Sequence, residues 1–144
     1  MNVDVMNLEK AKALLEKVQA SCTFANGEDS FYSTKRGVAP LLELLDDKKS
    51  LEGYSAADKV VGKAAAYLYI LLKVKCVYAG VISTHALSVF ERFGVSVEYG
   101  KLSEAIRNRD NTGYCPMETA VLDIDVPAEA VTAIRAKLEE LRRG

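Results

Sequence analysis

The stretch that decides the predicted fold is Ser55-Ala-Ala-Asp-Lys-Val-Val-Gly-Lys-Ala-Ala-Ala-Tyr-Leu-Tyr-Ile-Leu-Leu72. Beyond its first five residues it is apolar except at Gly62 and Lys63, and a helix that is apolar on all sides belongs inside a domain. Ser55 and Asp58 suit a variant capping box, and a carboxylate is favourable at the positive end of a helix dipole. We therefore predict a buried helix over residues 55–72 whose first turn opens into a polar crevice.

The charged residues of this first turn have two interpretations each. Lys59 and Lys63 lie four residues apart and would share a helix face, and Gly62 would let another backbone approach closely. The lysines are either surface residues that extend along apolar surface or a pair that binds an anion. Asp58 is either a helix-cap carboxylate or a group that pairs with the lysines, binds a polar ligand or moves a proton. A desolvated Lys63 would also suit base chemistry.

The composition of the 144 residues is that of a globular protein, with 49% hydrophobic residues, 27% charged residues and a formal net charge of −1. Without an excess of Lys and Arg, binding to nucleic acid is not expected. The longest uncharged apolar run, residues 64–72, is too short to cross a membrane, and the first residues lack the apolar core of a signal peptide. We expect one domain over residues 1–144 with no membrane partner.

The three cysteines, Cys22, Cys76 and Cys115, are an odd number and form no Cys-x-x-Cys pair. This pattern is typical of reduced thiols in the cytoplasm rather than of a disulfide framework, so we expect a cytoplasmic protein. Cys22 and Cys76 fall inside predicted strands and are expected to be inert core residues.

The remaining patterns place the other elements around the central helix. In chain order they predict a helix over 6–20, a hairpin of strands 21–25 and 30–34 around Asn26-Gly27, a short helix over 41–45, a strand over 76–82, a helix that ends near Phe93, a strand over 95–99, a short helix over 101–108, and helices that begin at Cys115-Pro116 and over 127–143.

The strand–helix–strand unit from Cys76 to Tyr99 should be a right-handed parallel crossover. Together with the antiparallel hairpin it predicts an α/β fold, a three-layer α/β/α arrangement whose mixed sheet has the hairpin at one edge. Ligands of such sheets bind beyond the carboxyl ends of parallel strands. Ser83, at the end of one strand, and the 55–58 segment are therefore expected to meet there.

Three stretches carry a family resemblance: Arg36-Gly37…Pro40-Leu41-Leu42, Ala57-Asp58-Lys59-Val60-Val61-Gly62-Lys63-Ala64-Ala65, and Thr112-Gly113-Tyr114-Cys115-Pro116-Met117-Glu118. They resemble an uncharacterised bacterial family, a domain of unknown function that is grouped with the cytidine-deaminase-like fold but lacks the zinc site. The resemblance covers residues 24–126. It implies a deaminase-like fold and carries no established chemistry.

The sequence departs from the zinc deaminases where their metal is bound. Those enzymes need a His or Cys at the start of the central helix with a Glu two residues later, and Pro-Cys-x-x-Cys after the next strand. The corresponding stretches, 57–60 and 83–87, contain neither a cysteine nor that glutamate. We predict no metal site, no cofactor and no deamination by the zinc route.

Loop residues near glycines supply further site candidates. Arg36, Arg109 and Asp110 flank Gly37 and Gly113, where arginine suits bidentate binding of carboxylate or phosphate or a salt bridge that fixes the loop. Cys115 at a helix start is either a thiolate favoured by the dipole or a structural cap before Pro116. Glu118 would complete a capping box with it.

Two hypotheses follow from these residues. In the first, the chain binds a small anionic or nucleotide-like molecule, with or without metal-independent catalysis. Its catalytic candidates are Asp58, Lys63 and Cys115, and its ligand-binding candidates are Arg36, Lys59, Ser83, Arg109, Asp110 and Glu118. In the second, the chain is a catalytically inactive deaminase fold that serves as an interaction or regulatory module and forms a homo-oligomer.

Overall fold

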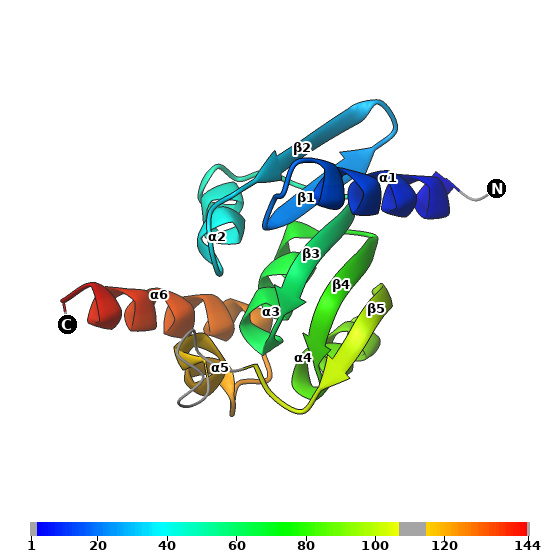
Figure 1. Cartoon of the computed structure of the whole chain (residues 1–144). Helices are drawn as coiled ribbons and strands as arrows, with labels where there is room; N and C mark the ends of the chain where they lie inside the picture. The colour runs from blue at the N-terminus through cyan, green and yellow to red at the C-terminus, as the bar shows by residue number, and fades with distance from the viewer. Residues whose placement is uncertain (1–2, 107–114, 144) are drawn as a thin grey trace.

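The computed structural model describes residues 3–106 and 115–143 (Figure 1). One mixed sheet has the strand order β2-β1-β3-β4-β5, formed by β1 (Cys22–Asn26), β2 (Asp29–Ser33), β3 (Ser55–Val61), β4 (Cys76–Ser83) and β5 (Ser96–Ser103). β1 is antiparallel to both β2 and β3, and β3, β4 and β5 are parallel. The prediction of a mixed α/β sheet with an antiparallel hairpin at one edge is confirmed.

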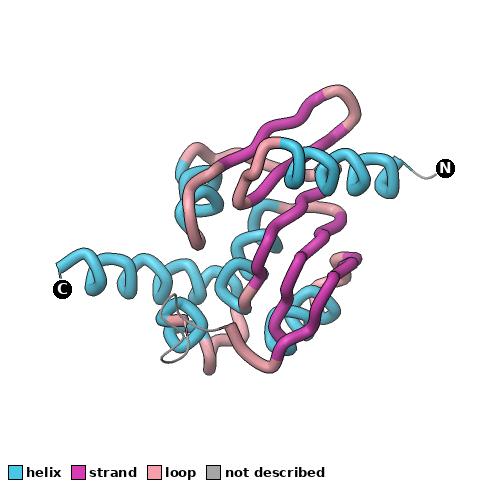
Figure 2. Tube along the Cα trace, viewed as in Figure 1, coloured by secondary structure: helices cyan, strands magenta, loops and turns pink. Residues whose placement is uncertain are grey.

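Helices cover both faces of this sheet (Figures 1 and 2). The described helices are α1 (Val3–Lys17), α2 (Ala39–Asp46), α3 (Lys63–Leu72), α4 (Thr84–Arg92), α5 (Pro116–Val121) and α6 (Pro127–Arg143). α1 packs on one face against β1 and β3, while α3 and α4 cover the other face and α2, α5 and α6 pack around α3. This arrangement is consistent with the predicted three layers. Within residues 3–106 and 115–143, no helix has the length and hydropathy needed to cross a bilayer.

The prediction of one helix over residues 55–72 is wrong in its first part. Residues Ser55–Val61 form β3, the middle strand of the sheet, and the helix begins only at Lys63. Ala56 and Ala57 are fully buried on opposite sides of β3, each in a different core cluster. Alanine favours a helix in isolation, but here its small side chain lets α1 and the opposite helical layer approach the middle strand closely. Tertiary packing therefore overrides the local preference.

This correction changes the roles of the polar residues in β3. Asp58 lies within the strand and does not cap a helix, and Ser55 is buried, with its hydroxyl donating to the backbone carbonyl of Asp4 in α1 at 3.3 Å. Lys59 is an exposed strand residue, whereas Lys63 begins α3. The two lysines therefore do not share a helix face.

Two other boundaries differ from prediction. Residues 101–103 continue β5, so the helix predicted over 101–108 does not begin there, and positions 107 and 108 lie outside the described residues. The first helix spans Val3–Lys17 rather than 6–20. The hairpin at Asn26-Gly27 is as predicted, with Gly27 at φ 61°, a left-handed conformation that favours glycine.

The larger core lies between the sheet and the layer of α3 and α4, and two tyrosines of α3 are fully buried in it. Their hydroxyl groups both find acceptors: Tyr67 donates to the carbonyl of Ile124, and Tyr69 donates to the carboxylate of Asp58. Buried tyrosines need such partners. α3 is thereby fixed to β3 at one position and to the segment before α6 at another.

Candidate functional site

The amino end of α3 is occupied by a side chain from a distant segment. Gly62 precedes the helix and provides no capping side chain. Instead, the carboxylate of Glu118 in α5 accepts hydrogen bonds from the backbone amides of Lys63 at 2.8 Å and Ala64 at 3.1 Å. The first amides of a helix have no partners within it, and the helix dipole favours an anion at this end. Glu118 therefore caps α3 from another element of the fold.

This position of Glu118 corrects one prediction. The capping box of Cys115 and Glu118 is not formed, because the Cys115 side chain makes no capping hydrogen bond and Glu118 extends to α3 instead. Pro116 does begin α5 as predicted. A capping box is a local pattern, and no local pattern indicates that the glutamate instead binds the amino end of a second helix.

The absence of a side chain at residue 62 is required by this contact. A Cβ atom at Gly62 would lie 2.3 Å from Cδ of Glu118, whereas the backbone there is extended, at φ −100° and ψ −179°, and suits any residue. We expect Gly62→Ala to lower the free energy of unfolding by about 2 kcal/mol through this overlap, measured by urea denaturation. In a Glu118→Ala background the same change should be nearly neutral; an equal loss in both backgrounds would contradict this explanation.

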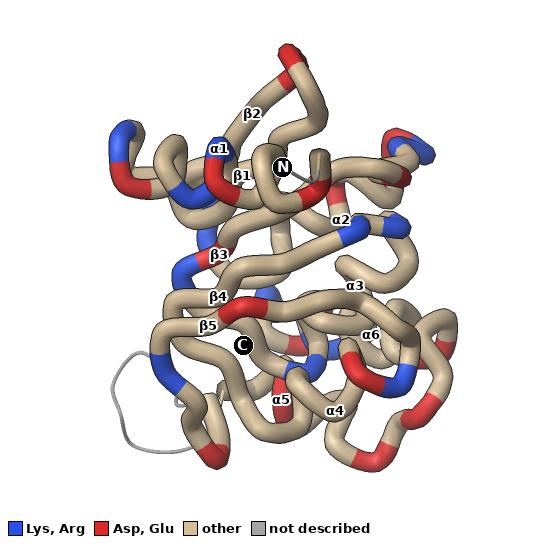
Figure 3. The backbone as a smooth tube through the Cα atoms, turned by 90° about the vertical axis from the view of Figure 1, so that its right-hand side faces the viewer, with Lys and Arg blue, Asp and Glu red and all other residues tan. Residues whose placement is uncertain are grey.

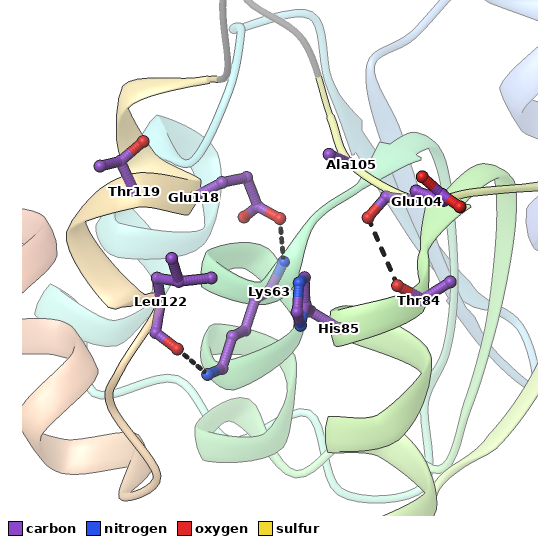
Figure 4. Close-up of a pocket in the computed structure, with 8 residues that line it drawn as sticks. All are labelled: Lys63, Thr84, His85, Glu104, Ala105, Glu118, Thr119 and Leu122. Atoms are coloured by element: carbon purple, nitrogen blue, oxygen red, sulfur yellow. Dashed lines mark hydrogen bonds between the residues drawn. The ribbon is translucent and has the colours of Figure 1, made fainter.

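The side chain of Lys63 also binds to the segment that contains Glu118. Its ammonium group donates to the carbonyl of Leu122 at 2.8 Å, immediately after α5, and only 9% of the residue is exposed (Figure 4). The ammonium also lies 5.7 Å from the ring centre of Tyr67. Lys63 therefore holds the end of α5 against α3.

The amino end of α4 lies beside this carboxylate. Ser83 is fully buried and caps α4, accepting from the amide of Ala86 at 3.1 Å. The Ser83 hydroxyl is 3.5 Å from Oε1 of Glu118. Since β3 and β4 are parallel and each is followed by one of these helices, Glu118 lies at the carboxyl ends of both strands, which is the usual place for a ligand in such sheets.

Two cavities adjoin Glu118. The first, which we call the Asp58 cavity, has a volume of about 360 Å³. Its lining includes Arg36, Asp58, Lys59, Cys115 and Glu118. Five of the predicted site residues, from three separate segments of the chain, thus surround one cavity.

The second cavity, the His85 cavity, has a volume of about 480 Å³ and is drawn in Figure 4. It lies at the amino ends of α3 and α4, and its polar lining residues include Lys63, His85, Glu104 and Glu118. The ammonium of Lys63 is already bound to a backbone carbonyl, so among the residues that the structure describes this cavity offers a ligand fewer unpaired Lys and Arg side chains than the Asp58 cavity does.

Asp58 is half-buried, and both of its carboxylate oxygens are hydrogen-bonded. One accepts from the hydroxyl of Tyr69 at 2.6 Å, and the other accepts from the amide of Val60 at 3.2 Å. Burial raises the pKa of Asp58 from 3.8 to about 6, and the hydrogen bonds from Tyr69 and the backbone oppose that rise. The group can therefore gain or lose a proton near neutral pH, as a general acid or base requires.

The thiols of the chain differ in their surroundings. Cys22 and Cys76 are buried in strands. Burial raises the pKa of each, and for Cys22 the charge of Asp58 raises the pKa further, so neither thiol forms a thiolate readily. Cys115 is half-buried and lines the Asp58 cavity. It is the one cysteine of the chain that is not buried.

The predicted site residues are therefore distributed unevenly. Lys63 and Ser83 adjoin Glu118 but do not line the Asp58 cavity, and Arg109 and Asp110 lie outside the described residues. Tyr69, which the sequence placed only in the core, is the residue that was missed. The available indication was a tyrosine in an apolar helix, because its hydroxyl group needs a partner.

No group of three His, Cys, Asp or Glu side chains within residues 3–106 and 115–143 is arranged to hold a metal ion.

Comparison with known proteins identifies the family. A family model described as a domain of unknown function (DUF1893) matches residues 10–138. The chain belongs to the DUF1893 family. The solved structures include a DUF1893 family protein (TM1506) from Thermotoga maritima that is 33% identical. The match covers 96% of this chain and 92% of that one, with a TM-score of 0.85. No curated protein matches the chain.

Membership in the DUF1893 family assigns no reaction or ligand, because its description is that of a domain of unknown function. The match does include β3, α3 and α5, since all of them lie within residues 10–138. The arrangement around Glu118 in this DUF1893 domain is therefore built from the region that the family model describes.

Proposed function

We propose that this DUF1893 domain binds a small anionic molecule, of the size of a mononucleotide or sugar phosphate, in the Asp58 cavity. The observation that carries the proposal is the convergence of two cations and a half-buried carboxylate on one cavity. The side chains of Arg36 and Lys59 line it, and neither forms an ion pair or hydrogen bond with another residue of the described chain. A volume of about 360 Å³ lies in the range of small-molecule sites.

The cations and carboxylates of the cavity suggest separate roles. Arg36 offers a guanidinium fork that suits phosphate or carboxylate, and Lys59 offers a second positive charge. Asp58, with its pKa near neutrality, would accept a hydrogen bond or a proton from the polar part of the ligand. If the domain is an enzyme, Asp58 is the proton-transferring group and Cys115 is the neighbouring thiol.

The predicted relation to the cytidine deaminases enters this proposal only as a hypothesis about fold. Zinc deamination requires His or Cys ligands and a proton-shuttling glutamate, and the residues around the Asp58 cavity and Glu118 do not supply that set. We therefore expect a reaction or binding function that does not depend on zinc. Metal analysis of the purified protein tests this expectation, and one zinc ion per chain would refute it.

A ligand pair that differs in one anionic group tests the proposal directly. We expect AMP to raise the melting temperature by about 3 °C at concentrations of about ten times its Kd, and adenosine to have a much smaller effect. The combined variant Arg36→Gln/Lys59→Gln should lose the AMP response, whereas the control Lys48→Gln, an exposed lysine outside the cavity, should keep it. Equal responses of both variants to AMP would contradict the assigned site. If neither AMP nor a panel of sugar phosphates and inorganic phosphate has an effect, the proposed ligand class is wrong.

The Cys115 thiol gives a second test that requires no knowledge of the ligand. Cys22 and Cys76 are buried, so alkylation of the native protein should occur at Cys115, with Cys115→Ser as the blank. The cations should favour anionic iodoacetate over neutral iodoacetamide, and the Arg36→Gln/Lys59→Gln variant should lower the ratio of the two rates by about threefold. An unchanged ratio would show that the cavity does not attract anions.

A further inference from the structure

β5 forms an open edge of the sheet. The strand order ends with β5, and its eight residues are exposed or half-buried. In Figure 3 β5 runs across the side that faces the viewer, with no helix in front of it. An edge strand of this length offers unpaired backbone donors and acceptors to another strand.

The side chains of β5 do not alternate regularly between the two faces of the sheet, because Glu98 and Lys101 lie on the same face. Glu98 is on the α1 face, because it forms an ion pair with Lys12 of α1 and is the register partner of Tyr78, which packs in the α1-side cluster. Lys101 is the partner of Val81. The next residue along β4, Ile82, is fully buried in the opposite core, so Val81 and Lys101 lie on the α1 face.

Residues 98 and 101 therefore share a face although an odd number of positions separates them, and in a regular strand they would not. The alternation changes at Gly80 and Gly100, which lack a register partner in the pairing of β4 with β5. A Cβ at Gly100 would lie 2.9 Å from the carbonyl oxygen of Gly80. The change of face therefore coincides with a close backbone contact between β4 and β5.

Because the side-chain alternation changes at Gly100, β5 is complementary to a second copy of itself. The strand reads Ser96-Val-Glu-Tyr-Gly-Lys-Leu-Ser103. If two copies pair antiparallel about the centre of the strand, Glu98 lies opposite Lys101 of the second copy on the α1 face. Val97 lies opposite Leu102 on the other face, because their partners Val77 and Ile82 are both in the large core. Opposite residues in antiparallel strands must share a face, and both pairs satisfy that condition.

We propose that β5 is a homodimerisation edge, at which two copies of this chain pair antiparallel through residues 96–103 and join their sheets into one. Tyr99 would lie opposite Gly100 of the second copy at the centre, where the glycine leaves room for the ring. Charged residues on an edge strand normally oppose pairing with other chains. In this register Glu98, which also pairs with Lys12 of its own chain, faces Lys101 of the second copy, so the charges favour a copy of the same strand over a strand with like charges at these positions.

The opposite edge of the sheet lacks these properties. β2 is five residues long, and its only charged residue is Asp29, so antiparallel pairing with its own copy offers no ion pair. The surface of one strand edge is also smaller than that of a standard stable interface. We therefore expect a reversible dimer with a Kd in the micromolar range.

Charge exchange within β5 tests the proposal. Analytical ultracentrifugation of the full chain over a concentration series should show a monomer–dimer equilibrium. Lys101→Glu and Glu98→Lys should each raise the dimer Kd by about tenfold or more, because like charges then face each other. The double variant Glu98→Lys/Lys101→Glu should restore dimerisation, and an equimolar mixture of the two single variants should form a heterodimer. Lys48→Glu, a control outside β5, should leave the Kd unchanged.

The contrary outcomes are equally specific. A wild-type chain that stays monomeric up to millimolar concentration would overturn the proposal. So would a dimer whose Kd does not respond to either single variant, or a double variant that is no better than the single ones. Circular dichroism and melting temperature of each variant distinguish loss of pairing from loss of folding, and increased protection of the β5 amides from hydrogen exchange at high protein concentration should accompany dimer formation.

Discussion

Replacing Glu118 by alanine is expected to lower the free energy of unfolding by about 3 kcal/mol, because the amides of Lys63 and Ala64 lose a charged acceptor at the amino end of a core helix. The contact with Ser83 is lost at the same time. Urea denaturation of the wild type and the variant measures the difference. Glu118→Gln keeps an acceptor oxygen and should cost less than half as much.

The site that the alanine variant leaves open provides a sharper test. Formate or acetate should enter it and raise the melting temperature of Glu118→Ala, since anions bind at helix amino ends and a ligand of the native state stabilises it. Sodium chloride at equal ionic strength is the control for salt effects, and Glu129→Ala, an exposed glutamate in the first turn of α6, is the control variant. If carboxylates stabilise the wild type and both variants equally, Glu118 does not occupy an anion site.

Replacing Asp58 by asparagine is expected to stabilise the protein at neutral pH although it removes a charged group. The pKa of this carboxyl is about 6 in the folded protein, against 3.8 for an unperturbed group. Ionising Asp58 in the folded state therefore costs more than in the unfolded state, at about 1.4 kcal/mol for each pKa unit. Asparagine keeps the shape and can exchange hydrogen bonds with Tyr69, so we expect a gain of about 2 to 3 kcal/mol at pH 8.

The pH dependence of this gain has a definite sign. Between pH 3.8 and about 6 the folded chain holds the Asp58 proton while the unfolded chain has released it. Stability falls with rising pH wherever the folded state binds more protons. The wild type therefore loses stability relative to Asp58→Asn through this window, the difference is constant above it, and it vanishes below it. Denaturation at intervals from pH 3.5 to 8 measures the difference.

Two further variants separate the causes of this effect. Asp123→Asn changes an exposed carboxylate and should show no such profile. Tyr69→Phe removes the hydroxyl that donates to Asp58, so it should raise the pKa of Asp58 further and move the window to higher pH. If Asp58→Asn is destabilising at every pH, the carboxylate is needed in its charged form and its assigned environment is incorrect.

Local patterns predicted the elements whose stability is decided locally. The Asn26-Gly27 turn and the helix starts at Pro116 and Pro127 were recognisable, because each acts through neighbouring backbone groups. β4 was recognisable as a continuous apolar run. β3 was not recognisable, because its alanines have a low strand propensity. Their small side chains suit a strand that is packed closely between two helical layers.

The candidate site shows the same division. Positions near glycines and predicted helix starts identified Arg36, Asp58, Lys59 and Cys115, which line one cavity. The expected position of Asp58 and Lys59 on a helix was wrong, because both lie in β3, whereas Cys115 does precede a helix as expected. The apolar helix indicated that a tyrosine would need a polar partner, but it did not distinguish Tyr69 from Tyr67, because which of the two contacts Asp58 depends on distant segments.

The sequence by itself determined the α/β class, the hairpin edge, the parallel crossover and the set of charged residues that could form a site. Only the tertiary structure decided that residues 55–61 are the middle strand, that Glu118 caps α3, and that Asp58 loses enough solvent to hold its proton near pH 6. The physical reason is the separation along the chain between the residues that decide each feature. Turns, caps and apolar periodicity depend on residues a few positions apart, whereas burial and the partner of each charged group depend on which distant segments meet.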